Sequence, residues 1–192
     1  MTKVFFVRHA QPLHEHNDDR TRPLTDEGLR DASIVLETLI DKDISAFYCS
    51  PYKRSLDTIK QTAEYYHAKI QTDERLRERE KGADGNNHGM FRKRWADHEY
   101  HEDGGESIGM VQRRNVEALN EILEKNRGGN IVIGTHGTAL SAIMNYYNPE
   151  FGCDDFLRII DWMPYIVEMD FEGRELVGVK EHAHVEKEFK GK

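Results

Sequence analysis

Three apolar runs of the sequence are each followed at once by residues that could do chemistry. The runs and their followers are 4–7 with Arg8-His9, 44–49 with Ser50, Lys53 and Arg54, and 131–134 with Thr135-His136-Gly137. If the runs are strands of a parallel sheet, their carboxyl ends meet at one edge, where such sheets bind ligands. We therefore expect two histidines and two arginines to converge at that edge, beside the starts of two helices.

This combination of residue types favours a phosphate group as the ligand. An arginine fork bonds two phosphate oxygens at once and keeps its charge, and helix starts add unpaired backbone N–H groups. A neutral imidazole can attack phosphorus, and a second, protonated histidine would stabilise the charge that grows on the oxygens. Taken singly, each residue has an ordinary structural explanation, but all four falling at strand exits favours a site.

The elements that must position these residues alternate between strand and helix patterns. The predicted strands are 4–7, 44–49, 69–72, 131–134, 157–160, 165–169 and 175–179, and the predicted helices are 25–40, 51–66, 107–127 and 138–147. This alternation predicts an α/β fold, a three-layer α/β/α sandwich. Its sheet is expected to be mixed but mostly parallel, with about six strands, one of them antiparallel.

A chain of 192 residues suits a single domain, 1–192, and two of its segments depart from the pattern. Residues 73–105 mix charged residues, glycines, histidines and tryptophan without a period, which predicts an insert that forms a lid over the active site. Residues 181–192 alternate histidine, lysine and glutamate, which predicts a flexible tail.

The charge balance excludes several classes of partner. The chain has 27 Lys and Arg against 35 Asp and Glu, a formal net charge of −8, so neither nucleic acid nor an anionic membrane surface is expected to bind it. No signal peptide or membrane span is apparent, and Cys49 and Cys153 indicate buried thiols in a reducing compartment. We expect a cytoplasmic protein.

Four motifs, in order, resemble the signature set of the histidine phosphatase superfamily, the phosphoglycerate mutase-like group. They are Val7-Arg8-His9-Ala10, Leu24-Thr25-Asp26-Glu27-Gly28, Ser50-Pro51-Tyr52-Lys53-Arg54-Ser55 and Gly134-Thr135-His136-Gly137. The resemblance covers about residues 3–170 and is specific because four motifs recur in order and spacing. It implies a phosphoglycerate mutase-like fold and points to the phosphatase branch.

The resemblance implies phosphoryl transfer through a phosphohistidine. By similarity His9 is the nucleophile. Arg8, Arg54 and His136 would form the phosphate pocket, with Gly137 beside them. His136 would count as a catalytic residue as well.

The resemblance also places an acid/base carboxylate in the stretch 76–82, where Glu78 matches and Glu80 is the alternative. A carboxyl group with an ordinary pKa is ionised at neutral pH and cannot donate a proton. The charge of a bound phosphate, with partial burial, would raise the pKa of Glu78 into a useful range.

Five residues are candidates for contact with the rest of the substrate: Gln11, Asn17, Arg79, Arg92 and Thr138. The asparagine that the family often has after the nucleophile is not at its usual spacing here, but Asn17 could take its place, and Gln11 could supply a polar contact instead. Arg92 lies in a basic run of the insert that is either solvated or binds a second charged group, and the pair Arg113-Arg114 has the same two interpretations.

Histidine pairs at 14/16, 98/101 and 182/184 lack a set of carboxylates or cysteines that would complete a metal site. We therefore expect no metal and no cofactor. The predicted function is a metal-independent phosphatase that hydrolyses a small phosphorylated metabolite. The alternatives are a cofactor-dependent mutase and a non-catalytic domain that binds a phosphorylated ligand. The oligomeric state, monomer or homodimer, is left open.

Overall fold

The computed structural model describes residues 1–83 and 87–188 and contains a six-stranded sheet in the order β3-β2-β4-β1-β5-β6. The strands are β1 (Thr2–Arg8), β2 (Ile44–Cys49), β3 (Ile70–Thr72), β4 (Asn130–Thr135), β5 (Trp162–Glu172) and β6 (Glu175–Glu186). β1 to β4 are mutually parallel, whereas β5 is antiparallel to both of its neighbours. The predicted mixed sheet with one antiparallel strand is confirmed.

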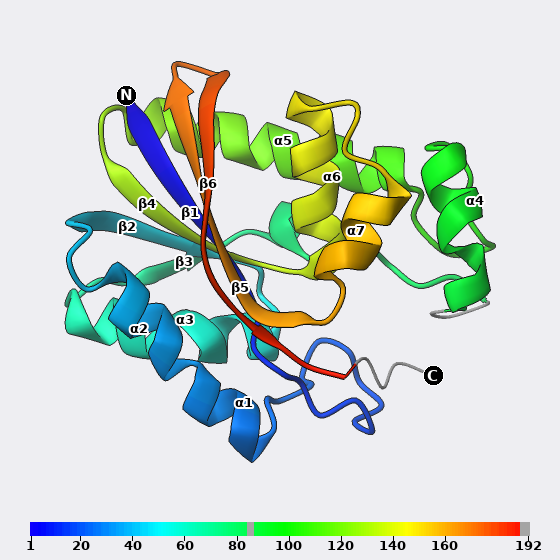
Figure 1. Cartoon of the computed structure of the whole chain (residues 1–192), viewed down its shortest axis with the longest axis horizontal. Coiled ribbons are helices and arrows are strands. Elements are labelled where there is room, and N and C mark those ends of the chain that lie inside the picture. Colours follow the sequence, from blue (N-terminus) through cyan, green and yellow to red (C-terminus); the bar gives the residue numbers. More distant parts are fainter. Residues whose placement is uncertain (84–86, 189–192) are drawn as a thin grey trace.

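Helices cover both faces of the sheet (Figure 1). They are α1 (Asp26–Asp31), α2 (Ser33–Leu39), α3 (Lys53–Tyr65), α4 (Phe91–Ala96), α5 (Ile108–Lys125), α6 (Gly137–Tyr147) and α7 (Cys153–Ile159), with short 3-10 turns η1 (Glu74–Leu76) and η2 (His88–Met90). No helix in the described ranges is long and apolar enough to cross a membrane.

Alternation along the buried strands builds a core on each side of the sheet. In β1, Val4 and Phe6 pack with residues of α5, α6 and α7, whereas Phe5 and Val7 pack with residues of α2 and α3. Successive side chains of a strand point to opposite faces, so one strand serves both cores. The predicted three-layer sandwich is confirmed.

Two predicted elements take a different form. The predicted helix 25–40 is two helices, α1 and α2, which adjoin at Ala32. The predicted strand 157–160 is wrong, because Leu157 to Ile159 belong to α7. A short apolar run fits a buried strand and a buried helix equally well. Here the Asp155 carboxylate accepts the N–H of Gly152 at 3.0 Å and so caps the helix.

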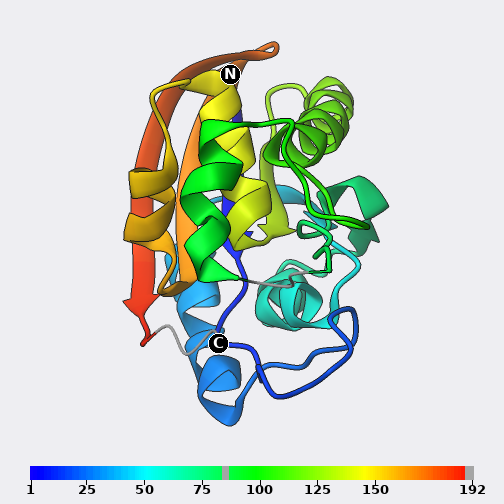
Figure 2. The same cartoon turned by 90° about the vertical axis from the view of Figure 1, so that its right-hand side faces the viewer.

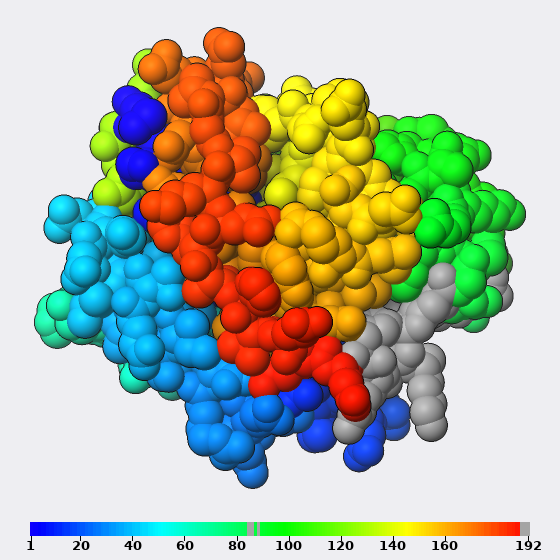
Figure 3. Space-filling view, in the orientation of Figure 1, coloured from blue at the N-terminus to red at the C-terminus, as the bar shows by residue number. Residues whose placement is uncertain are grey.

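The prediction of a flexible tail is wrong for residues 181–186, which form the second half of β6. The indole of Trp162 stacks on the ring of His184 at 3.8 Å, and Lys187 pairs with Asp31 at 2.7 Å. Figure 3 shows β6, in orange and red, lying across the surface between α2 and α7. Because β6 is an edge strand, its charged residues are tolerated there and hide the strand pattern.

The described parts of the insert 73–105 fold against the rest of the domain as the short elements η1, η2 and α4 joined by irregular segments. Its ends run side by side: the N–H of Ala83 donates to the carbonyl of Asp103 at 3.0 Å. A side chain at Gly82 would lie 2.5 Å from Cβ of Glu102, so only glycine permits this approach. In Figure 2, α4 stands in front of the sheet near α7. The ring of Phe91 meets that of Phe156 at 5.2 Å. The role of the insert as a lid stays a prediction.

A buried ion-pair cluster fastens the insert from within. Glu102 lies between Arg94, which it pairs with through Oε1, and Arg79, whose Nη1 is 3.4 Å from Oε2. All three side chains are at most 6% exposed. Removing one partner of a buried pair leaves an uncompensated charge, which costs far more than losing an exposed pair.

Glu102→Ala is therefore expected to lower the free energy of unfolding by about 3–5 kcal/mol. Two buried guanidinium groups would lose their carboxylate. Denaturant unfolding measures the change, and the matched control is Glu99→Ala, which removes the exposed partner of Arg113 and should leave stability near wild type. Equal losses in the two variants would contradict the interpretation.

Candidate active site

The predicted site residues converge at the carboxyl ends of β1, β2 and β4. The N–H of His9 donates to the carbonyl of Thr135 at 3.2 Å, and the N–H of Ser50 to the carbonyl of Gly134 at 3.0 Å, which ties the three strand exits together. A cavity of about 120 Å³ lies there. The predicted residues that line it are Arg8, His9, Arg54, Glu78, Arg79, Gly137 and Thr138.

His9 presents a neutral imidazole to this cavity. Its Nδ1 lies 2.8 Å from the carbonyl oxygen of Ala10. A carbonyl only accepts, so Nδ1 carries the proton and Nε2 keeps its lone pair. Burial, with the charges of Arg54 and Arg8, lowers the pKa of His9 well below 6.5. At neutral pH the ring therefore carries only the Nδ1 proton and is uncharged, which is the state required of a nucleophile.

Arg8 is buried against the start of α6. Its Nη1 donates to the carbonyls of Ile159 at 2.5 Å and Trp162 at 3.2 Å, whereas Nε has no partner within the described residues. A Cβ on Gly137 would lie 3.2 Å from the guanidinium, so glycine lets Arg8 lie close against the helix. Burial lowers the pKa of Arg8 to about 10, which leaves it charged at neutral pH.

Arg54, 3% exposed in the first turn of α3, approaches from the other side. Its Nη1 donates to the carbonyl of Asp19 at 2.6 Å and lies 3.2 Å from the carboxylate of the same residue. The guanidinium also lies over the ring of Tyr52, 5.1 Å from its centre. Burial lowers the pKa of Arg54 and the charge of Asp19 opposes that effect.

His136 lies behind His9, with ring centres 5.3 Å apart. Its Nε2 is 2.7 Å from the hydroxyl of Ser50, and its Nδ1 is buried with no partner in the described part of the chain. Burial and the charge of Arg54 lower the pKa of His136 well below 6.5. This differs from the expected protonated histidine: before a ligand binds, the ring is neutral, because water is excluded and cations surround it.

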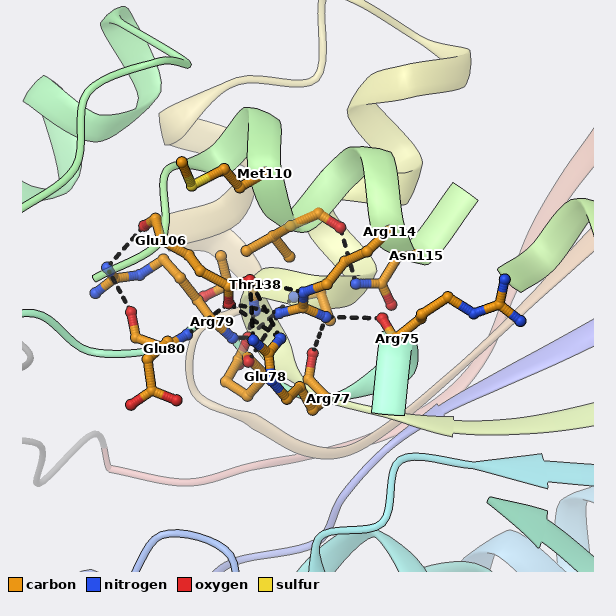
Figure 4. A network of polar contacts seen from close by, with 12 residues as sticks. Arg75, Arg77, Glu78, Arg79, Glu80, Glu106, Met110, Arg114, Asn115 and Thr138 are labelled. Carbon is orange, nitrogen blue, oxygen red and sulfur yellow. Dashed lines mark hydrogen bonds and ion pairs between the residues drawn. The ribbon is translucent and has the colours of Figure 1, made fainter. Parts of the chain in front are cut away.

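The Glu78 carboxylate sits at the start of α6. Its Oε2 accepts the N–H of Thr138 at 3.0 Å, and its Oε1 accepts the N–H groups of Ala139 at 3.1 Å and Arg79 at 2.8 Å. Glu80 is exposed, and Figure 4 shows its carboxylate turned away from Thr138. Of the two candidate carboxylates, the structure brings Glu78 into the cavity and not Glu80.

Three of the candidates for substrate contact lie elsewhere. Among the described residues, Gln11, Asn17 and Arg92 do not line the cavity. The side-chain oxygen of Gln11 accepts the hydroxyl of Thr25 at 2.9 Å, Asn17 is exposed, and Arg92 pairs with Asp154 on the surface. Arg79 and Thr138 do line the cavity.

Sequence reasoning missed a charged group at the cavity wall. Asp19 lies 2.6 Å from Arg22, 3.2 Å from Arg54 and 3.9 Å from Lys81. Arg22 and Asp19 belong to a charged loop without periodicity, so no pattern singled them out. Lys81 follows Glu78 by three positions, which was the available signal.

Part of the cavity lining is apolar and consists of Pro12, Phe91, Phe156, Ile160 and Met163. In residues 1–83 and 87–188, no group of three or more histidine, cysteine, aspartate or glutamate side chains is arranged to hold a metal ion.

Comparison with known proteins identifies the family. The chain belongs to the histidine phosphatase superfamily (branch 1), whose profile matches residues 4–175. This confirms the resemblance carried by the four motifs. It also confirms, at the level of the family, the predicted class of enzyme, a phosphoric monoester hydrolase.

Individual relatives are more distant. Phosphoserine phosphatase 1 of Hydrogenobacter thermophilus is 23% identical over 185 residues, which cover 81% of this chain and 83% of that protein. The solved structure of Bacillus stearothermophilus YhfR is similar with a TM-score of 0.78 and 24% identity, over 92% and 95% of the two chains. Phosphoserine phosphatase from Entamoeba histolytica, in complex with phosphoserine, has a TM-score of 0.77 and 19% identity, over 96% of each chain.

The depressed pKa values of His9 and His136 predict a pH-dependent stability. The unfolded chain binds a proton on each ring as pH falls through about 6.5, whereas the folded chain does not. The free energy of unfolding should therefore fall from about pH 7.5 to about pH 5.5, by up to about 1.4 kcal/mol per pH unit for each histidine.

Denaturant unfolding across this range measures the slope. His9→Gln and His136→Gln should each reduce it, and substitution of the exposed His101 by glutamine should leave it unchanged. Parallel curves for wild type and both buried-site variants would contradict the assignment of neutral rings.

Proposed function

We propose that the protein is a metal-independent phosphatase that hydrolyses a small phosphate monoester through a phosphohistidine on His9. The observation that carries the proposal is the state of His9. The ring is buried and neutral, its Nδ1 proton is held by the carbonyl of Ala10, and its Nε2 has no hydrogen-bond partner among the described residues, while burial and the cations Arg54 and Arg8 lower its pKa. Membership of the histidine phosphatase superfamily supports it.

In the first step, Nε2 of His9 attacks phosphorus, the P–N bond forms, and the bond to the ester oxygen breaks. Glu78, protonated when the substrate is bound, gives its proton to the leaving oxygen, so an alcohol departs. The ring gains positive charge as its lone pair is shared, and the carbonyl of Ala10 at Nδ1 stabilises that charge.

In the second step, water attacks the phosphohistidine. Glu78, now a carboxylate, takes a proton from the water as its oxygen bonds to phosphorus. The P–N bond breaks, inorganic phosphate leaves, and both His9 and Glu78 return to their starting states. No oxidant, reductant or metal ion is needed for this balance.

Arg8, Arg54 and His136 bind the phosphoryl group in this scheme, with the N–H of Gly137. The unpartnered Nε of Arg8 and Nδ1 of His136 supply two buried donors without a partner among the described residues. A neutral His136 donates from Nδ1 when the hydroxyl of Ser50 donates to Nε2.

The walls of the cavity support a substrate class. A phosphorylated metabolite with a second acidic group fits a cavity whose lining includes the cations Lys81, Arg22 and Arg79 as well as apolar side chains. Structural neighbours from Entamoeba histolytica were solved with phosphoserine and with 3-phosphoglyceric acid. A cytoplasmic location stays a prediction.

A mutase and a non-catalytic binding domain remain the alternatives, and one experiment separates them. The purified protein is assayed with excess EDTA on p-nitrophenyl phosphate and on a panel of phosphorylated metabolites. Wild type should release phosphate with EDTA present, and His9→Ala should not, because no nucleophile remains. Loss of turnover with EDTA contradicts the metal-free mechanism. A phosphoglycerate isomerisation that needs a bisphosphate primer identifies a mutase. Phosphate binding without turnover identifies a binding domain.

Glu78→Gln tests the acid. Its kcat/KM, which reports formation of the phosphohistidine and not its hydrolysis, should fall by roughly 10²–10⁴-fold on an alkyl phosphate, whose leaving group needs a proton. It should change little on p-nitrophenyl phosphate, whose leaving group departs as a stable anion. Glu80→Gln is the matched control and should behave as wild type. A wild-type rate for Glu78→Gln on the alkyl phosphate, with a slow Glu80→Gln, would transfer the role to Glu80.

A further inference from the structure

Arg114, on α5, is turned inward onto the segment that carries Glu78, and only 14% of its side chain is exposed. Its Nη1 donates to the carbonyls of Arg75 and Arg77, both at 2.7 Å, and its Nη2 to the carbonyl of Glu78 at 2.9 Å. Figure 4 shows these contacts meeting at one guanidinium. A single side chain thus binds three backbone carbonyls of a segment that has no strand partner to supply these hydrogen bonds.

Glu106, just before α5, holds the same guanidinium from the other side. Its Oε1 accepts Nε of Arg114 at 2.9 Å and its Oε2 accepts Nη2 at 2.8 Å, a bidentate pair. Oε2 also accepts the N–H of Glu80 at 2.8 Å, and Arg77 donates at 3.2 Å. Burial opposes the charge of Glu106, but the bonds from Arg114 and from the N–H of Glu80 outweigh it and hold its pKa at about 2.

These contacts fix the backbone on both sides of residue 78. The carbonyls of Arg77 and Glu78 are bound by Arg114, and the N–H of Glu80 by Glu106. The far end of the Glu78 side chain is bound separately, by N–H groups of α6. Glu78 is therefore held between two helices: a side chain of α5 binds its backbone, and N–H groups of α6 bind its carboxylate.

We propose that Arg114 and Glu106 form a positioning pair that sets where the Glu78 carboxylate stands relative to the phosphoryl group. The proposal rests on the proposed function, because it needs Glu78 to act as the acid and base. The polar atoms of Arg114 and Glu106 bind each other and the backbone of residues 75–80, so both act through Glu78 rather than on the substrate.

A comparison with Arg113 shows that binding of the Glu78 segment is specific to position 114. Arg113 is exposed and pairs with the exposed Glu99 at 2.8 Å. Both residues are arginines on the same helix, yet Arg113 is exposed to solvent and Arg114 binds the backbone of the segment that carries Glu78. Arg113→Met therefore serves as the matched control for Arg114→Met.

The test compares kcat/KM on an alkyl phosphate with kcat/KM on p-nitrophenyl phosphate, because kcat/KM reports formation of the phosphohistidine and not its hydrolysis, in which Glu78 also acts. Arg114→Met should lower the first on the order of 10²-fold, because a misplaced general acid transfers its proton poorly. It should lower the second little, and the Kd of inorganic phosphate should stay near wild type. Arg113→Met should match wild type on both substrates.

The double variant Glu78→Gln with Arg114→Met separates positioning from general damage to the fold. If Arg114 acts through Glu78, it should be no slower on the alkyl phosphate than Glu78→Gln alone. A further loss there, or an equal loss on both substrates, would overturn the proposal. If Arg114→Met does not fold, Glu106→Gln, which keeps the shape of the side chain, should give the same selective loss to a smaller degree.

The outcomes distinguish this proposal from the one on which it rests. Wild type that turns over neither substrate refutes the phosphatase and the positioning pair together. Wild type that turns over both, with an Arg114→Met variant of unchanged substrate ratio, refutes the positioning pair alone.

Discussion

Positive charge held out of water at the carboxyl end of the sheet is the constraint on which the site depends. Arg8 and Arg54 are both nearly inaccessible to solvent, where a guanidinium is costly unless it is compensated. The compensation is incomplete: carbonyls meet Arg8, and Asp19 meets Arg54. Burial, together with this remaining positive charge, lowers the pKa of His9 and His136, and the positive charge supports the proposed binding of a phosphate dianion there.

Glu78 is held in place by a different set of contacts from those that hold His9 and the two arginines. Glu78 stands on a segment with no regular structure, and side chains supply what a strand or helix would otherwise supply. Arg114 and Glu106 bind the backbone of this segment, and the start of α6 binds the carboxylate. Farther along the insert, the buried pair of Arg94 with Glu102 holds Arg79 at the cavity wall. His9, the proposed nucleophile, thus rests on the sheet, and Glu78, the proposed acid, rests on a network of ion pairs.

Much of the fold and half of the site were predictable because short-range pattern carries them. The strand ends at Arg8-His9 and Thr135-His136 were readable from apolar runs, and the parallel topology then required them to meet. The prediction of a strand at 157–160 was wrong because so short an apolar run has no period that distinguishes a strand from a helix. The second half of β6 was missed because an edge strand carries charges as a tail does.

The sequence by itself determined the family, the sheet that brings His9 and His136 together, and the choice of residues for a phosphate. Only the tertiary structure decided which carboxylate faces the cavity, that both histidines are neutral, and that Arg114 binds the Glu78 segment while Arg113 meets solvent. The physical reason is that protonation and charge pairing depend on burial and on contacts between residues distant in the chain. Adjacent arginines look identical until packing sets which of them loses water.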